Sequence, residues 1–225
     1  MLHDGHRDRL RERFLTSADS FEDHEILELV LFYSIPRKNT NDIAHTLLNR
    51  FGSIKGVLDA NIDALAEVED IGHKSALHIK AISKLILKYH ISEQKSDGLL
   101  KSPATLSTFL KALFIGTQNE ISYILLFDNA KKLITCEKIG AGISTEQTVS
   151  LREITYKALA NNATSIILVH NHPNGQAFPS REDILATNKA KMVLGALGIT
   201  LMEHFIVAED KCQPIINVQK ADIFN

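Results

Sequence analysis

The chain has 225 residues, of which 44% are hydrophobic, a fraction typical of globular proteins and too high for a disordered chain. Its 25 Lys and Arg and 27 Asp and Glu leave a net charge of −2, which excludes the basic composition of a strong nucleic-acid-binding protein. No run of eighteen apolar residues occurs and the N-terminus is charged, so we expect a cytoplasmic protein without a membrane segment or secretory signal.

The two cysteines are too few for a disulfide framework. Cys136 and Cys212 also lack the Cys-x-x-Cys spacing of a metal site, which agrees with a reducing compartment. Free cysteine is among the most buried residue types, so both are expected to lie in the core or on strands.

Residues 1–92 are predicted to form an all-α domain. Apolar residues recur at helical spacing in HEILELVLFYSI, NDIAHTLLNRF and KSALHIKAISKLILKYH, with turn signals between these runs. Residues 1–90 contain twelve Lys and Arg against fourteen Asp and Glu, and the four arginines of GHRDRLRERF are interspersed with acidic residues. We therefore interpret the N-terminal segment as a solvated helix face and not as a nucleic-acid contact.

Residues 93–102 are polar, contain Gly and precede Pro103, and are predicted to link the helical domain to a second domain, residues 103–225. Helical and β-rich segments alternate in the second domain, which predicts an α/β sandwich and an α+β two-domain protein overall. In chain order we expect a helix at 105–114, a β-hairpin of strands 121–128 and 132–140, and a helix at 150–161. A strand at 164–170, a helix at 180–198 and a strand at 199–208 are expected to follow.

The most informative stretch runs from Ser165 to Asp183 and reads SIILVHNHPNGQAFPSRED. Side chains two residues apart in a strand point to the same side, so His170 and His172 can present two imidazoles to one point. Ser180 is placed to cap a helix, and Asp183 follows in the first turn, which can bring a carboxylate to that point. Two histidines, one carboxylate and a water complete a tetrahedral catalytic zinc site, although other first-row ions also accept these ligands.

Each part of this pattern also has a purely structural interpretation. A histidine at a strand end is usually half exposed, Ser-x-x-Asp resembles a capping box, and an acidic residue near a helix N-terminus is favoured by the helix dipole. The conjunction of all these parts at fixed offsets favours the metal site.

The segment HNHPNGQAFPSRED resembles the JAMM (JAB/MPN+) metalloprotease motif in the version found in the RadC family, and GHRDRLRERF, HEILELVLFYSIPRKNT, RFGSIKGVL, LREITYKAL and EHFIVAE resemble further RadC segments in the same order. The resemblance implies a JAB/JAMM (cytidine-deaminase-like) fold for residues 103–225 and a helix-hairpin-helix-like fold for residues 1–92. It also implies a zinc-dependent hydrolase that cuts a peptide or isopeptide bond in a protein or peptide substrate, with His170, His172 and Asp183 as zinc ligands.

Such an enzyme needs a general base, because the attacking water must lose a proton. JAMM enzymes supply a glutamate well upstream of the histidines, and Glu120, just before the first expected strand, matches it. Glu153 is the rival candidate, but its place beside Arg152 on an expected helix is explained more simply by an exposed ion pair or a capping role. We therefore predict that Glu120 is the base.

The resemblance gives two further residues a role. Ser180 would hydrogen-bond the developing oxyanion, although capping the helix is its simpler role. His204, on the last expected strand, lies where the family has Asp-His. It is interpreted either as a residue that supports a ligand or faces the substrate, or as an ordinary strand histidine.

Other function classes fit less well. A zinc deaminase would need His-x-Glu and Pro-Cys-x-x-Cys, and both are absent. A DNA-binding or DNA-repair accessory protein is the main alternative, because LAEVEDIGHKSALHIKAI resembles a helix-hairpin-helix element. Asp70 stands at the first glycine position of that hairpin, where a carboxylate repels phosphate, so packing or protein contact is favoured over nucleic-acid binding. A catalytically silent scaffold is not predicted, since every proposed ligand and the base are present.

Overall fold

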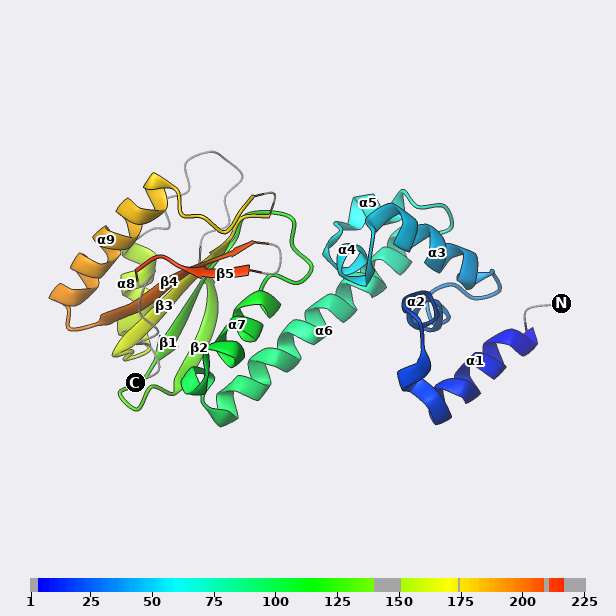
Figure 1. Ribbon diagram of the computed structural model, residues 1–225, viewed down its shortest axis with the longest axis horizontal. Coiled ribbons are helices and arrows are strands. Elements are labelled where there is room, and N and C mark those ends of the chain that lie inside the picture. The colour runs from blue at the N-terminus through cyan, green and yellow to red at the C-terminus, as the bar shows by residue number, and fades with distance from the viewer. Residues whose placement is uncertain (1–3, 140–150, 174, 209–210, 217–225) are drawn as a thin grey trace. The chain divides into compact units, whose positions relative to one another are not determined.

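The structure, a computed structural model, describes residues 4–139, 151–173, 175–208 and 211–216 (Figure 1). By its internal contacts the chain divides into two compact units, which are treated separately below. The first comprises Met1–Ile86 with Ile115–Gln118, and the second comprises Leu87–Phe114 with Asn119–Asn225. No helix in the described part of the chain is long and apolar enough to cross a membrane.

The first unit is helical, as the apolar spacing predicts. Its helices are α1 (Asp4–Ser17), a 3-10 turn (Ala18–Ser20), α2 (Asp23–Leu31), α3 (Thr40–Phe51), α4 (Ile54–Asp59), α5 (Ile62–Ala66) and the first part of α6 (His73–Asp97). Side chains of Asn39, Ser53 and Asn61 accept backbone N–H groups at the starts of α3, α4 and α5, which explains why these short helices begin where they do. The core is aliphatic and includes Leu31, Leu47, Val57, Leu65, Ile71 and Ile79.

A turn joins α5 and α6 at the position of the predicted hairpin. Asp70 adopts a left-handed backbone conformation, with a φ of 68°, in the position where a glycine would be relaxed. Its carboxylate pairs with the Lys38 ammonium, and the next residue, Ile71, is buried in the core of the unit. The turn is thus held by packing and by an ion pair on its surface. Its assignment as a helix-hairpin-helix element stays a prediction.

One short segment from beyond α6 also belongs to the first unit. Gly116 donates its N–H to Asp59 Oδ1 at 2.7 Å, and its carbonyl accepts from Lys80 Nζ at 3.0 Å. Gly116 has a φ of 78°, and a Cβ there would lie 3.0 Å from Ser83 Cβ and 3.2 Å from the Leu58 carbonyl oxygen. This position therefore requires glycine, and the segment held on the first unit ends at Gln118, two residues before Glu120.

The predicted linker at 93–102 is largely helical instead. The helix α6 continues to Asp97, Gly98 turns the chain with a φ of 81°, and a 3-10 turn (Leu99–Lys101) follows. A polar stretch is compatible with an exposed helix as well as with a linker, which is why composition did not distinguish the two. The boundary between the units falls inside α6, between Ile86 and Leu87.

The second unit is a mixed α/β structure around a five-stranded sheet, which confirms the mixed α/β prediction (Figure 1). The strand order is β2-β1-β3-β4-β5, with bounds β1 (Ser122–Phe127), β2 (Leu133–Ile139), β3 (Ser165–Asn171), β4 (Thr200–Ala208) and β5 (Lys211–Pro214). Among the strands of the described residues, β3 and β4 pair in parallel and the other neighbours pair antiparallel. The strand β5 was not predicted, because four residues that end in proline carry little strand signal.

Helices cover both faces of this sheet (Figure 1). One face packs against α7 (Pro103–Ala112) and the end of α6 through a core that includes Leu110, Phe127, Val169 and Phe205. The other face packs against α8 (Leu151–Ala160) and α9 (Arg181–Ala196) through a core that includes Ile154, Ile166, Leu168 and Leu194. The expected start of α8 at Ser150 lies outside the described residues. The cysteines lie on β2 and β5, half buried and unpaired by any disulfide.

An irregularity in the pairing of β3 with β4 decides which face β4 presents. Ile166 pairs with Leu201, but the next residue, Ile167, pairs with Glu203, so Met202 is an extra residue in β4. Beyond this bulge His204 pairs with Leu168 and therefore points to the same face as Leu168, toward α9. Without the extra residue the alternation would direct His204 to the opposite face.

Candidate metal centre

The two histidines of the motif lie at the end of β3 and share one side of the chain, as the strand period predicts. His170 belongs to the face that α9 covers and is almost fully buried, with 4% of its side chain exposed. His172 follows the strand, and its backbone N–H continues the pairing with β4 by donating to the Val207 carbonyl at 2.9 Å. Its side chain is 22% exposed, so the centre opens toward solvent at His172.

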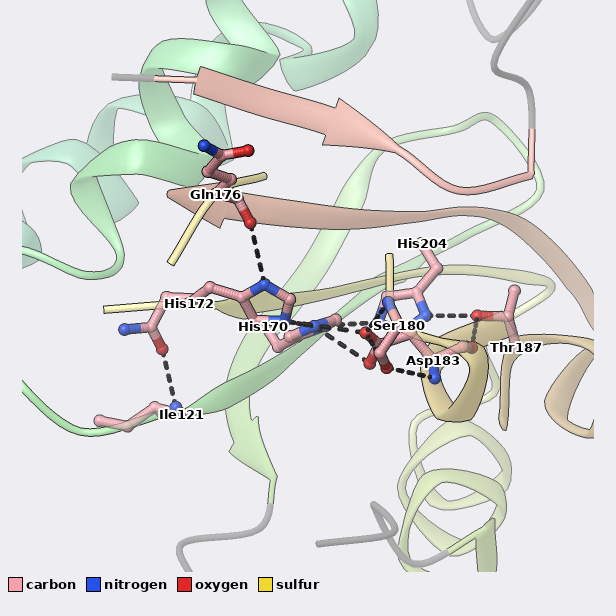
Figure 2. Close-up of polar contacts among 9 residues, drawn as sticks. Ile121, His170, His172, Gln176, Ser180, Asp183, Thr187 and His204 are labelled. Carbon is pink, nitrogen blue, oxygen red and sulfur yellow. Dashed lines mark hydrogen bonds and ion pairs between the residues drawn. The ribbon is translucent and has the colours of Figure 1, made fainter. Parts of the chain in front are cut away.

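The third residue comes from the start of α9. Ser180 caps the helix: its Oγ accepts the Asp183 N–H at 3.0 Å and donates to Asp183 Oδ2 at 2.6 Å, and its own N–H donates to Oδ2 at 2.8 Å. This capping box holds one carboxylate oxygen and leaves the other directed at His170 (Figure 2). Burial would raise the pKa of Asp183, but the Ser180 hydrogen bonds and the nearby His170 outweigh it and hold the pKa below its usual value.

The donor atoms converge at distances that suit one small cation. His170 Nε2 lies 3.0 Å from His172 Nε2 and 3.2 Å from Asp183 Oδ1, and His172 Nε2 lies 3.7 Å from Asp183 Oδ2. Ligands at about 2.0–2.1 Å from a tetrahedral zinc ion are separated by roughly 3.3 Å, close to the 3.0 and 3.2 Å that separate His170 Nε2 from the other two donors. Within the part of the chain that the structure describes, this group of three can hold a metal ion.

The hydrogen bonds behind the histidines leave both Nε2 atoms free to bind a metal (Figure 2). His172 Nδ1 lies 3.1 Å from the Gln176 carbonyl oxygen, an acceptor, so this nitrogen carries the proton. On the other ring, His170 Nδ1 lies 2.9 Å from His204 Nε2. The tautomer of His170 therefore depends on that of His204.

The tautomer of His204 is fixed by a series of hydrogen bonds that starts at Thr187 on α9. The single hydroxyl proton of Thr187 is donated to the Asp183 carbonyl oxygen at 2.6 Å, so its oxygen accepts from His204 Nδ1 at 2.7 Å. A neutral His204 then accepts at Nε2 from His170 Nδ1, which leaves His170 Nε2 unprotonated. Proton donation from a liganding histidine to a buried acceptor fixes the orientation of the ring and raises its basicity.

Burial keeps both of these histidines neutral. It lowers the pKa of His170 to about 4, although Asp183 opposes the shift and His172 adds to it. It lowers the pKa of His204 to about 3, and His170 adds to that shift. Near neutral pH each ring is therefore neutral and carries one proton, on Nδ1, and His170 Nε2 carries none.

These shifts predict a pH-dependent stability for the metal-free protein. In the unfolded chain both histidines bind a proton near their ordinary pKa of about 6.5, whereas in the folded chain they do so only near 4 or below. The unfolded state binds more protons in this window, so the free energy of unfolding should fall as the pH is lowered from about 6.5 to about 4. Urea midpoints measured in excess chelator test this. A His204→Gln variant should show a shallower slope, and the exposed control His73→Gln should not.

The proposed base, Glu120, lies just ahead of β1 and is exposed. The pairing of β1 with β3 places Ser122 opposite His170, and this register, continued by two residues on each strand, places Glu120 opposite His172. Residues two apart in a strand have side chains on the same face, so the side chain of Glu120 leaves the backbone on the same side of the sheet as those of both histidines. The rival, Glu153, lies in the first turn of α8, 3.9 Å from Lys157 Nζ, which agrees with the ion-pair interpretation.

Three residues around the centre carry no signal in the motif analysis. The Gln176 carbonyl accepts the Nδ1 proton of His172, and the Thr187 hydroxyl accepts the Nδ1 proton of His204. Asn171, between the two histidines, is 4% exposed and bonds to the chain on both sides of Glu120. The motif treats Asn171 as a spacer, so its contacts become visible only through the pairing of β1 and β3.

Comparison with known proteins covers both units. A family model described as the RadC-like JAB domain matches residues 100–217. A UPF0758 protein of Fusobacterium nucleatum is 34% identical over 214 residues, which is 92% of each chain. A UPF0758 protein of Ruegeria pomeroyi is 35% identical over 205 residues, 91% of this chain and 92% of its own. Neither name assigns an activity, so the chemistry must be argued from the centre itself.

Proposed function

The chain belongs to the RadC family, and on this basis we propose that it is a zinc-dependent hydrolase that cleaves a peptide or isopeptide amide bond. The observation that carries the proposal is the convergence of His170, His172 and Asp183, with the Nδ1 atom of each imidazole bonded to a group outside this set of three. A bound zinc ion would polarise the amide carbonyl and lower the pKa of a water molecule. The three side chains account for three ligand positions, which leaves one for water or substrate.

In this proposal Glu120 acts as the general base. Its register position opposite His172 lies at the more exposed edge of the centre, where a substrate carbonyl can approach. A carboxylate there accepts the proton of the attacking water and then delivers it to the leaving amine. Cleavage thus adds the elements of water across the C–N bond, giving a carboxylate and an amine, with no other reactant.

Ser180 is proposed to donate a hydrogen bond to the developing oxyanion. Its hydroxyl proton is donated to Asp183 Oδ2 in the present arrangement, so it must rotate toward the substrate to do this. The backbone N–H of Ser180 remains bonded to the same carboxylate oxygen, so the rotation does not release Asp183. After this rotation the hydroxyl can donate to the negative charge that develops on the substrate oxygen and so contribute to the stabilisation of the transition state.

The alternative, a DNA-binding accessory protein, has weaker support from the residues of the first unit. The carboxylate of Asp70 occupies the hairpin where backbone N–H groups would approach a phosphate, and it is paired with Lys38. Binding of DNA by the intact chain with a steep salt dependence would reverse this preference.

The test of the proposal is zinc-dependent cleavage. Protein stripped with chelator and reloaded with one equivalent of zinc is incubated with a soluble cell extract, and newly formed amines are labelled and identified by mass spectrometry. We expect new α-amines or lysine ε-amines at recurrent positions, which are absent from the stripped protein and restored by zinc. A protein that binds no zinc, or whose zinc form yields no products beyond those of the stripped form, contradicts the proposal.

A further inference from the structure

Asn171 connects the motif to the strand that precedes it. Its side chain lies on the opposite side of the chain from His170 and His172, because neighbouring residues of a strand alternate. Its Oδ1 accepts the Ile121 N–H at 2.7 Å, and its Nδ2 donates to the Asn119 carbonyl oxygen at 3.1 Å. Its backbone N–H donates to the Ile121 carbonyl oxygen at 3.3 Å. One buried residue therefore makes three hydrogen bonds to the chain around Glu120.

These bonds prolong the sheet where its backbone ladder ends. The ladder between β1 and β3 stops at the pair Ser122 and His170. In a regular antiparallel ladder the Ile121 N–H would bond to the backbone carbonyl of Asn171, but the carboxamide oxygen takes that place. The carboxamide nitrogen then reaches one residue further, past Glu120 to Asn119. The register is thereby maintained as far as the residue opposite His172.

We propose that Asn171 is a positioning residue that holds Glu120 at the metal centre, an inference that rests on the proposed function. Glu120 is exposed and precedes the first strand, so its backbone has no ladder of its own to fix it. Bonds to the residues immediately before and after it restrict its backbone, and a general base must lie within hydrogen-bond reach of the proton that it accepts. The residue between the two ligands thus couples base and ligands through one strand end.

A purely structural role for Asn171 would predict a different set of effects. If the carboxamide only satisfied two backbone groups, its loss would lower stability and leave the chemistry of Glu120 unchanged. Asn161 provides a matched control, because its side-chain Nδ2 donates to the Lys157 carbonyl at 2.9 Å at the end of α8. Asn161→Ala removes the same kind of bond without contact to Glu120 or the ligands.

The hydrogen bonds from Asn171 to the residues on either side of Glu120 are tested by hydrogen exchange in the full-length protein, without any substrate. In Asn171→Ala, the Ile121 amide should exchange about five- to tenfold faster, while amides of β4 and the zinc content stay unchanged. In Asn171→Asp, which keeps the acceptor for Ile121 but loses the donor to Asn119, the increase should be smaller. Unchanged exchange at Ile121 in both variants would overturn the inference, whatever the activity of the protein.

The positioning role is tested through the metal. Cobalt-loaded protein is titrated with pH, and the midpoint of its visible absorption change is compared between variants. Glu120→Gln should move this midpoint, Asn171→Ala should move it in the same direction, and the double variant should add nothing to Glu120→Gln. With an identified substrate, Asn171→Ala should lower kcat by about 10–100-fold at an unchanged KM.

The outcomes separate the inference from the function on which it rests. If Glu120→Gln leaves the midpoint in place, the role of Glu120 as base is wrong and the positioning role falls with it. If Glu120→Gln moves the midpoint while Asn171→Ala behaves like Asn161→Ala, only the role of Asn171 is wrong.

Discussion

Replacing Glu120 by glutamine should lower kcat for amide hydrolysis by roughly 10²–10⁴-fold, the usual contribution of a positioned general base. Glutamine keeps the size of the side chain but cannot accept the proton of the attacking water. Glu120 is exposed and supplies no metal ligand in our assignment, so the variant should fold normally and retain one zinc per chain. The measurement is a single-turnover rate on a cleavable substrate together with metal analysis of the same sample.

Glu153→Gln is the matched control for this experiment. Glu153 was the rival candidate for the base, and it lies 3.9 Å from Lys157 Nζ on α8, whereas Lys157 contacts Glu137 more closely, at 2.5 Å. The loss of this exposed pair should leave kcat unchanged. A Glu120→Gln protein with full activity, or a Glu153→Gln protein that has lost it, would show that the base was assigned to the wrong glutamate.

His172→Ala should weaken zinc binding by more than about 100-fold, because even the loss of a residue that only supports a ligand costs 10–100-fold. His172 suits this test better than His170, since its side chain is partly exposed and its removal leaves no buried cavity. Competition with a chromophoric chelator gives the affinity, and urea unfolding checks that the fold is retained. The control His73→Ala removes an exposed histidine of α6. A His172→Ala protein that binds zinc like the parent would exclude this residue as a ligand.

The proposed ligands were predictable because their arrangement is local. His170 and His172 are two residues apart in one strand, and Asp183 lies three residues after a helix-capping serine, so two short-range periods suffice to bring them together. The order of helices and strands in the second unit was predictable for the same reason, since each element has its own hydrophobic period. The helical structure of most of the polar stretch at 93–102 was not predicted, because composition alone does not distinguish a polar helix from a linker.

The contacts of His204 and Glu120 depend on pairing between strands, so the local pattern of residues does not predict them, and only the family resemblance pointed to these two residues. His204 reaches His170 only because Met202 is an extra residue in β4, so that the side chains after it point to the opposite face. The alternation of apolar and polar residues in β4 does not indicate this bulge. Glu120 depends in the same way on the register of β1 against β3. The motif gives the spacing of residues along the sequence, whereas the register between paired strands determines which residues of different strands are in contact.

The segment Ile115–Gln118 limits how freely the two units can be recombined in evolution. It lies after residue 100, where the match to the family model begins, yet its partners Asp59, Asn61 and Lys80 all precede that point. A gene fusion joined at residue 100 would carry the sheet and its ligands intact but would separate Gly116 from the residues that hold it. Descendants should therefore inherit the helical unit and the unit with the candidate metal centre as a pair. A domain that replaces the helices must supply new contacts for this segment, which ends two residues before the proposed base.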